Sequence, residues 1–404
     1  MGTLGFLSSQ TRIVSIFAYR LLNKLQTSAN ANTGSAIIFC LYLEVSSLIR
    51  KPLLFLPGPM QVPDHIRVAG DRPLFSHRSV PMLDLLGKLE AGCRPLFGTQ
   101  SDVIFLAASG TGAMESAIAN LTSPGDEILV VVGGTFSERW KHIADGYGLT
   151  VRVADVDWRH GASPEDMEKA LEKWPKANVV FITWSESSTG VLIELERIGK
   201  LVRGQGRILV ADAVSGLAVS PMEMDSWSVD AVVVGSQKGL MLPPGLGVVA
   251  IGPRAWEKQK VSRTPRFYWD WTKYKAAVPF TPALSLLFQL EAALDFIHGQ
   301  GKEKIFARRA AVADRVRALV RKSEMEIYAR RPGNGITGVI PPGGFDIEGL
   351  IRRLDAEFGI QIGEGQGLIK KTTFRIGHVG HLTDEEIDYF TECFEKCVRE
   401  QRRS

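Results

Sequence analysis

Two residues that could take part in one reaction follow consecutive apolar segments of the sequence. Asp212 comes directly after the segment 208–211, and Lys238 follows the segment 231–234 after Gly235-Ser-Gln. A lysine amine can form a Schiff base with a carbonyl group, and a carboxylate can hold a ring nitrogen protonated. Taken singly, an aspartate at the end of a strand most often caps a helix or forms a turn, and a lysine there is most often a solvated surface residue. Their positions after consecutive segments favour shared chemistry.

A glycine-containing turn adds an anion site to this pair. Ser109-Gly-Thr-Gly112 follows the apolar segment 103–106 and leads into an amphipathic stretch. Glycines let the backbone approach an anion, and a helix N-terminus supplies free N–H groups. Alone, the turn would be ordinary, because it lacks the third glycine of a dinucleotide fingerprint and the lysine of a nucleotide-phosphate loop. A lysine, a carboxylate and an anion site are the three parts that pyridoxal phosphate chemistry needs.

Short apolar segments alternate with longer amphipathic stretches through the middle of the chain. The apolar segments are 103–106, 128–132, 151–153, 179–182, 208–211 and 231–234. The stretches long enough for crossover helices are 112–121, 136–147, 164–174 and 195–203. This alternation predicts an α/β domain whose mostly parallel sheet is covered on both faces. Ligands of such sheets bind at the carboxyl ends of the strands, where Asp212 and Lys238 are expected.

The two ends of the chain differ from this middle part. Beyond about residue 290 the pattern predicts a smaller α+β domain. Its helices are expected near 301–322, 346–357 and 383–400, and its strands near 337–340 and 373–376.

Residues 1–51 hold five basic residues and one acid, so they account for the net charge of +4. We predict an N-terminal extension over 1–51, a large domain over 52–290 and a small domain over 291–404. The extension is typical of a tail or a mis-assigned start, and a targeting peptide is the alternative.

Composition excludes several classes of protein. The chain has 404 residues, 45% hydrophobic and 23% charged, which excludes a disordered or collagen-like chain. The small net charge gives little support for a nucleic-acid partner, and no apolar run approaches the 18 residues or more of a membrane span. The four cysteines show no metal-ligand spacing, so we expect no metal. We expect a cytoplasmic protein.

Several motifs in register carry a resemblance to a known family. They are Leu56-Pro-Gly-Pro59, Ser109-Gly-Thr-Gly112, Gly133-Gly-Thr-Phe-Ser-Glu-Arg-Trp140, Glu186-Ser-Ser-Thr-Gly190, Gly235-Ser-Gln-Lys238, Phe280-Thr-Pro282 and Phe374-Arg-Ile-Gly-His378. With them, the chain from about Leu56 to its last helix resembles the class V aminotransferases, most closely the alanine–glyoxylate and serine–pyruvate group. The resemblance implies a pyridoxal-phosphate-dependent transferase of fold type I. That fold has a mostly parallel seven-stranded sheet between helices and a smaller C-terminal α+β domain.

The resemblance also implies a role for each matching residue. Lys238 would carry the Schiff base and act as the proton-transfer group, and Asp212 would hold the ring nitrogen. The cofactor would further contact Ser109, Gly110, Thr111, Gly112, Ala113, Phe136, Ser187, Gln237 and Thr281. Gly58, Ser187 and Arg375 would bind the substrate, with Arg375 on its carboxylate. Thr281 would reach the cofactor of a partner subunit, which implies a homodimer. The aromatic cluster Trp269, Trp271 and Tyr274 is expected at that interface.

The predicted function is transamination from alanine or serine to an oxo acid such as glyoxylate or pyruvate. Aspartate or an aminophosphonate is the alternative donor. A cysteine desulfurase is disfavoured because Gln237, not histidine, precedes Lys238. A non-enzymatic phosphate-binding protein is the remaining alternative. The chain departs from the family pattern at Trp184-Ser185, where members often have histidine and then glycine or asparagine. It departs again at Ala277-Val278, near which many members have tyrosine.

Overall fold

The computed structural model describes residues 52–276 and 278–402. The chain divides into two units, Met1–Pro52 and Leu53–Ser404, and the second unit contains the described helices and strands. The expectations for residues 1–51 and the departure at Ala277 lie outside the described residues.

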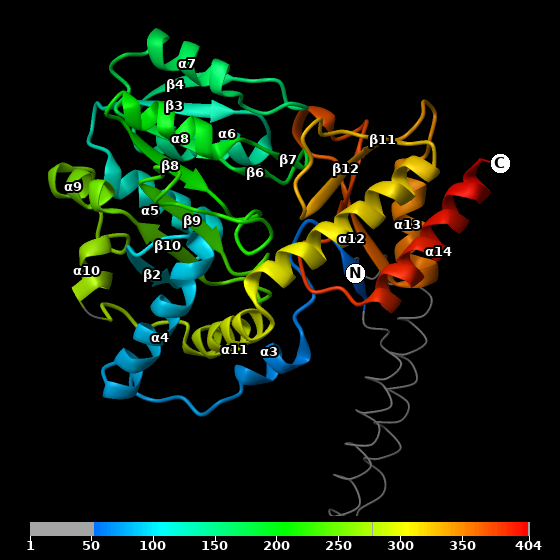
Figure 1. The fold of residues 1–404 in the computed structure, drawn as a ribbon, viewed down its shortest axis with the longest axis horizontal. Helices are drawn as coiled ribbons and strands as arrows, with labels where there is room; N and C mark the ends of the chain where they lie inside the picture. Colours follow the sequence, from blue (N-terminus) through cyan, green and yellow to red (C-terminus); the bar gives the residue numbers. More distant parts are fainter. Residues whose placement is uncertain (1–51, 277, 403–404) are drawn as a thin grey trace, which may run out of the picture. The chain divides into compact units, whose positions relative to one another are not determined.

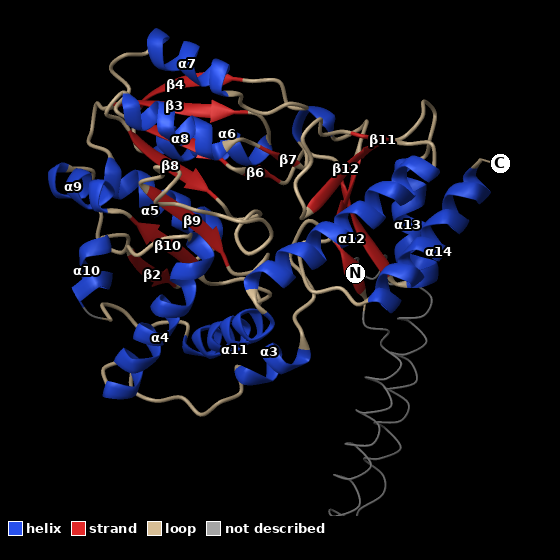
Figure 2. Ribbon diagram, in the orientation of Figure 1, coloured by secondary structure: helices blue, strands red, loops and turns tan. Residues whose placement is uncertain are grey.

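A seven-stranded sheet forms the centre of the larger part of this unit (Figures 1 and 2). Its strand order is β2 (Asp102–Leu106), β10 (Gly247–Ile251), β9 (Ala231–Gly235), β8 (Ile208–Asp212), β5 (Val179–Thr183), β3 (Glu127–Val132), β4 (Thr150–Asp155). All neighbours pair in parallel except β10, which is antiparallel to both β2 and β9. The mostly parallel sheet is confirmed, and six strands coincide with the expected segments. Strand β10 was not among the expected segments.

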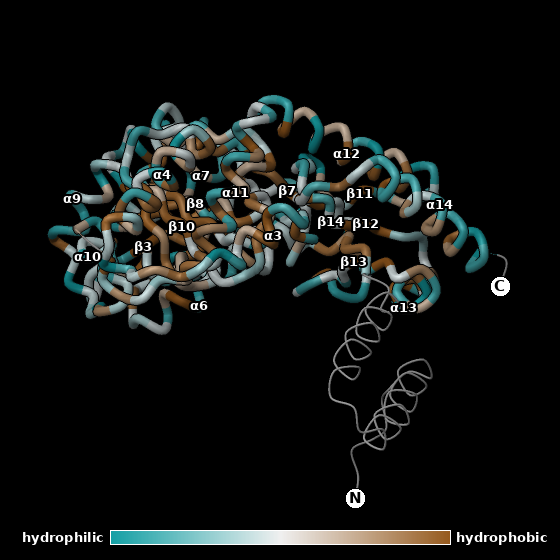
Figure 3. The backbone as a smooth tube through the Cα atoms, turned by 90° about the horizontal axis from the view of Figure 1, so that it is seen from below, coloured by the Kyte–Doolittle hydropathy of each residue, from teal (hydrophilic) through white to brown (hydrophobic). Residues whose placement is uncertain are grey.

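Helices cover both faces of the sheet because successive strand residues point to opposite sides. On β9, Val232 and Val234 pack in one hydrophobic core, whereas Ala231 and Val233 pack in another. The first core includes α4 (Val80–Phe97), α7 (Pro164–Lys173), α8 (Leu195–Gly204) and α11 (Leu284–Gln300). The second includes α5 (Gly110–Leu121), α6 (Thr135–Gly146), α9 (Pro253–Val261) and α10 (Trp271–Ala276). Figure 3 shows the resulting hydrophobic interior.

A second sheet has five strands, in the order β1 (Leu53–Phe55), β13 (Ile360–Glu364), β14 (Phe374–Gly377), β12 (Ile336–Ile340), β11 (Glu326–Ile327). Helices α12 (Lys302–Lys322), α13 (Ile347–Phe358) and α14 (Asp384–Gln401) share its core. These three helices and strands β12 and β14 agree with the sequence pattern. The first described strand, β1, pairs in parallel with β13 and therefore belongs to this small sheet. The proposed division after residue 290 falls inside α11 and stays a prediction.

The remaining elements are short and connect these layers. They are α3 (Asp64–Ala69), the paired strands β6 (Ser185–Glu186) and β7 (Val191–Leu192), and a 3₁₀ turn at Gly367–Ile369. None of the helices within 52–276 and 278–402 combines the length and apolar character needed to cross a membrane. Trp271 does not fit the expected interface cluster, because it is buried in the subunit's own core and its Nε1 donates to Ser116 Oγ at 3.1 Å.

Candidate active site

A cavity of about 240 Å³ lies where the parallel strands end at their carboxyl termini. The sequence-predicted residues that line it are Gly58, Ser109, Gly110, Thr111, Phe136, Ser187, Asp212, Gln237 and Lys238. They come from the opening segment, from the N-termini of α5 and α6, from the turn between β6 and β7, from the end of β8 and from the loop after β9. The structure thus brings together most of the predicted set. Gly112, Ala113, Arg375 and Thr281 do not line this cavity.

Lys238 lies in the loop after β9 and is only 7% exposed. Its Nζ donates a hydrogen bond to the carbonyl of Pro57. Gly58 comes so close that a Cβ at this position would lie 2.6 Å from Lys238 Cε and 2.8 Å from Nζ. Burial and the positive charge of Arg375 lower the pKa of Lys238 to about 8. An amine with this pKa can lose and regain a proton near neutral pH.

Asp212 is the last residue of β8 and is also buried. Its Oδ1 accepts a hydrogen bond from the backbone N–H of Val214 at 2.8 Å. Thr183 Oγ1 lies 3.5 Å from Oδ2. Burial, followed by the negative charge of Glu186, raises the pKa of Asp212 to about 7. A carboxylate in such a place is stabilised by a positively charged partner, which a protonated ring nitrogen supplies.

The anion turn forms the first turn of α5. Ser109 is the N-cap, and its Oγ accepts from the N–H of Gly112 at 3.3 Å. Gly110 is tightly packed, since a Cβ there would lie 2.7 Å from Val214 Cγ2. Opposite the turn, the buried Oε1 of Gln237 has no hydrogen-bond partner among the described residues. Its amide can rotate to donate to an anion. The N-terminus of α5 and the amide of Gln237 together fit a phosphate group.

Arg375 lies on β14, next to the cavity, and is 6% exposed. Its Nε donates to Glu364 O at 2.7 Å, and its Nη1 donates to Ser187 O and to Gln366 Oε1, both at 3.0 Å. Burial lowers the pKa of Arg375 to about 10. The bond to Ser187 attaches the small sheet to a loop that lines the cavity.

Glu186 is a buried carboxylate beside the site that the sequence analysis gave no role of its own. Its carboxylate accepts from the N–H groups of Phe136 at 3.2 Å and Ser137 at 2.9 Å, at the N-terminus of α6. It also accepts from the Ser188 hydroxyl at 2.6 Å. A carboxylate is stabilised there by the helix dipole. Glu186 therefore fixes the position of Phe136. In the sequence, Glu186 could have been singled out as the one charged residue of the motif Glu186-Ser-Ser-Thr-Gly190.

Arg139 is a second residue of the site that the sequence analysis missed. It lines the cavity, and its Nη1 donates to Thr111 Oγ1 at 2.8 Å. Its guanidinium carbon lies 4.7 Å from the centre of the Phe136 ring, within the range of a cation–π contact. In the sequence, Arg139 could have been singled out because it follows Phe136 by about one helical turn.

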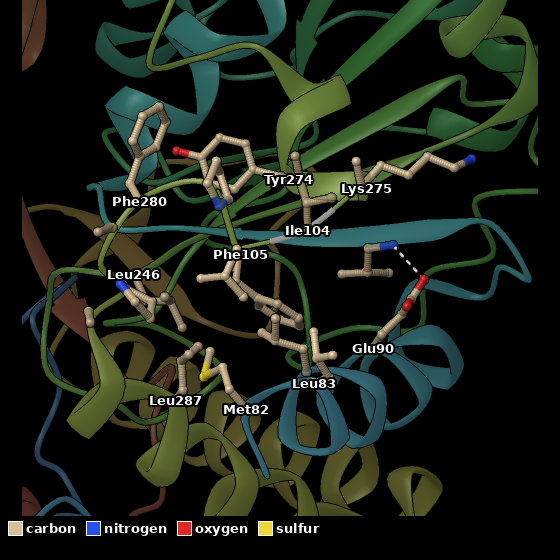
Figure 4. A pocket seen from close by; sticks show the side chains of 18 of the residues that line it. Met82, Leu83, Glu90, Ile104, Phe105, Leu246, Tyr274, Lys275, Phe280 and Leu287 are labelled. Atoms are coloured by element: carbon tan, nitrogen blue, oxygen red, sulfur yellow. Dashed lines mark hydrogen bonds between the residues drawn. The ribbon is translucent and has the colours of Figure 1, made fainter. Parts of the chain in front are cut away.

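Thr281 is exposed and lies at a different pocket of about 370 Å³, shown in Figure 4. Phe280 and Tyr274 lie on one side of this pocket, and Met82 and Leu287 lie on the other (Figure 4). The pocket lies along β2, at the edge of the large sheet. Within one chain, Thr281 is therefore not part of the Lys238 cavity.

Two further residues from the sequence patterns, His378 and Trp184, have packing roles. His378 is buried, with Nε2 2.9 Å from Thr337 Oγ1 and Nδ1 3.1 Å from Asn334 O. Trp184, the departure from the family pattern, is 2% exposed and packs closely against Gly216, where a Cβ would lie 2.4 Å from its ring. It therefore fills space behind the loop after Asp212.

Comparisons with known proteins agree with this geometry. The family model described as aminotransferase class-V matches residues 74–390. A Synechococcus protein named soluble hydrogenase, small subunit, is 36% identical over 83% of this chain and 90% of its own length. The L-aspartate–glyoxylate aminotransferase of Paracoccus denitrificans is 34% identical over 82% and 87%. The solved structure of an alanine–glyoxylate aminotransferase from Nostoc sp. superposes with a TM-score of 0.83 at 28% identity, covering 87% and 96%. The fold type I architecture is confirmed.

Proposed function

Because the chain belongs to the class V aminotransferases, we propose that it transfers an amino group from alanine or serine to glyoxylate or pyruvate. The proposal depends above all on one observation. A buried amine, Lys238, and a buried carboxylate, Asp212, line the same cavity at the ends of adjacent parallel strands.

The residues of this cavity suit pyridoxal phosphate. The unpartnered Oε1 of Gln237 and the N-terminus of α5 suit the phosphate, together with Ser109 and Thr111. Phe136 would cover the ring, Asp212 would hold its nitrogen, and Ser187 would approach its hydroxyl. When bound, this cofactor supplies an aldehyde that reacts with amines and a ring that withdraws electrons from the substrate's Cα.

Lys238 would hold and move the proton at the substrate's Cα. Its pKa of about 8 lets Nζ act first as base and then as acid. Asp212 would remain negative beside a positive ring nitrogen, because that charge offsets the cost of its burial. Arg375 would exchange its bond to Gln366 for the substrate's carboxylate, which its planar guanidinium can bind through two hydrogen bonds. Holding the carboxylate would aim the Cα–H bond at Lys238.

Arg139 favours a second candidate donor, an acidic amino acid such as aspartate. It places an additional positive charge at the cavity wall, and none of the ion pairs within 52–276 and 278–402 uses it. One relative is named L-aspartate–glyoxylate aminotransferase. Replacing Arg139 by methionine separates the candidates: an aspartate enzyme would lose kcat/KM selectively for aspartate over alanine, and an alanine enzyme would not.

The direct test is spectroscopic. Purified protein supplied with pyridoxal phosphate should gain a visible absorption band that borohydride abolishes and that Lys238→Ala lacks. Single-turnover reactions with alanine, serine, aspartate and an aminophosphonate would then rank the donors by the rate at which the band is lost. A protein that stays colourless, or a Lys238→Ala variant with wild-type turnover, would contradict the proposal.

We propose further that the chain works as a homodimer. Most side chains that line the pocket along β2 are apolar, although Glu90, Asp102 and Lys275 also line it, and Leu83 at this pocket is 56% exposed. Such a surface suits a second copy of the chain. Thr281 lies there rather than at the Lys238 cavity of its own chain, as expected if it serves the partner.

A further inference from the structure

Arg309 is a buried cation outside the cavity. It lies on α12, which connects the end of α11 to the small sheet (Figure 1), and it is 3% exposed. Burial lowers its pKa to about 10. Among the ion pairs of the described chain, none involves Arg309. A buried charge without a carboxylate partner reduces stability unless hydrogen bonds compensate.

The guanidinium of Arg309 bonds to two loops of the large sheet. Nη1 donates to the carbonyl of Ala218, and Nη2 donates to the carbonyl of Gly239 at 3.0 Å. Gly239 directly follows Lys238, and Ala218 lies in the turn after Asp212. One side chain therefore joins the two loops that carry the proposed catalytic pair.

At this contact one loop has an unfavourable backbone conformation and the other is closely packed. Ala218 has a φ of 57°, in the left-handed region that is unfavourable for a residue with a Cβ. At Gly239 a Cβ would lie 2.1 Å from Leu217 O and 3.1 Å from Arg309 Nη1. The loops are thus packed against each other with the guanidinium beside them. The bonds to Arg309 help to offset the unfavourable backbone at Ala218.

We propose that Arg309 is a positioning residue that holds Lys238 in its reactive place by tying α12 to the loops after β8 and β9. The inference rests on the proposed role of Lys238. An arginine suits this task because its rigid fork presents two N–H groups to two acceptors. A lysine places a single ammonium group at the end of a flexible chain and cannot hold both carbonyls in the same geometry.

The test compares Arg309→Met and Arg309→Lys with a matched control, Arg207→Met. Arg207 is 7% exposed and likewise donates to two carbonyls, those of Trp174 at 3.1 Å and Leu171 at 2.6 Å. It does not touch either catalytic loop. Removing it should therefore cost stability without moving Lys238.

The main readout is the pH dependence with which an acylating reagent labels Lys238 in the cofactor-free protein, followed by mass spectrometry. The charges of Arg375, Asp212, Glu186 and Arg139, which act on Lys238, remain in every variant. Arg309→Lys also keeps the positive charge at position 309, so a shift in that variant reports the loosened loop and not a lost charge. Loosening the loop admits water, so the midpoint of labelling should rise by about one pH unit in the Arg309 variants. It should stay unchanged in Arg207→Met. In the loaded enzyme, kcat of the Arg309 variants should fall on the order of 100-fold.

An unchanged labelling midpoint in a folded Arg309 variant would overturn the inference. If Arg309→Met does not fold, Arg309→Lys carries the same test with the charge retained. Equal shifts in the Arg309 and Arg207 variants would also overturn it, because they would report general loosening. Failure of the proposed function is recognised separately, because the wild-type protein would then stay colourless with pyridoxal phosphate, or Lys238→Ala would keep wild-type turnover, whatever the labelling shows.

Discussion

At the residue scale, Gly58 has little freedom to change. It has a φ of 139°, and any Cβ would lie within 2.8 Å of three Lys238 atoms. We predict that Gly58→Ala displaces Lys238 and abolishes both the absorption band and turnover. Gly344→Ala is the control, because Gly344 also has a positive φ, 80°, but open space around it. Both variants should lose about 1–3 kcal/mol in urea unfolding. Normal turnover of Gly58→Ala would contradict the assignment of Gly58 to the site.

The raised pKa of Asp212 predicts how pH changes the stability of the cofactor-free protein. The folded protein holds this proton up to about pH 7, whereas the unfolded chain releases it near 3.8. Between these values the unfolded state binds fewer protons, so the free energy of unfolding falls as pH rises. Relative to Asp212→Asn, the wild type should lose up to about 1.4 kcal/mol per pH unit. Urea unfolding of both proteins across this range measures the difference, and parallel curves would refute the prediction.

At the scale of elements, the N-terminus of α5 has two tasks. Ser109 caps the helix through Gly112 N and also lines the cavity. We predict that Ser109→Ala costs about 1 kcal/mol of unfolding free energy and also weakens pyridoxal phosphate binding. Thr383→Ala is the matched control, because Thr383 caps α14 through Glu386 N at 3.2 Å, away from the cavity. Equilibrium dialysis and urea unfolding separate the effects. Equal cofactor affinity in the two variants would show that Ser109 is a cap only.

At the scale of the whole molecule, subunit complementation tests whether Thr281 serves the partner. We predict that Lys238→Ala and Thr281→Glu are each inactive as homodimers, the latter because a carboxylate repels the cofactor's phosphate. A mixed dimer combines Lys238 of one subunit with Thr281 of the other and so contains one complete site. Reassembly from equal amounts should restore about a quarter of the wild-type activity, since half of the dimers are mixed. Activity no higher than that of the parents would place Thr281 in its own chain's site or in none.

Much of this protein was predictable from local sequence. Asp212 and Lys238 were found because apolar strands end where polar residues begin, and the carboxyl ends of parallel strands meet at one edge of a sheet. The helix pattern after residue 300 was equally local. Strand β10 was missed although its residues are apolar, because it follows the Pro-Pro-Gly turn directly instead of a crossover helix. The placement of β1 in the small sheet depends on pairing with β13, some 300 residues later.

The sequence by itself determined which residues carry chemistry and which strands present them, because hydrophobic periodicity and short motifs are local properties. Only the tertiary structure decided what surrounds them. It brought Gly58 against Lys238, Glu186 to the start of α6, and Arg309 to the carbonyls of Ala218 and Gly239. It also separated Thr281 from the cavity of its own chain. These contacts join segments far apart in the chain, and the pKa values of Lys238 and Asp212 follow from the burial that the contacts create.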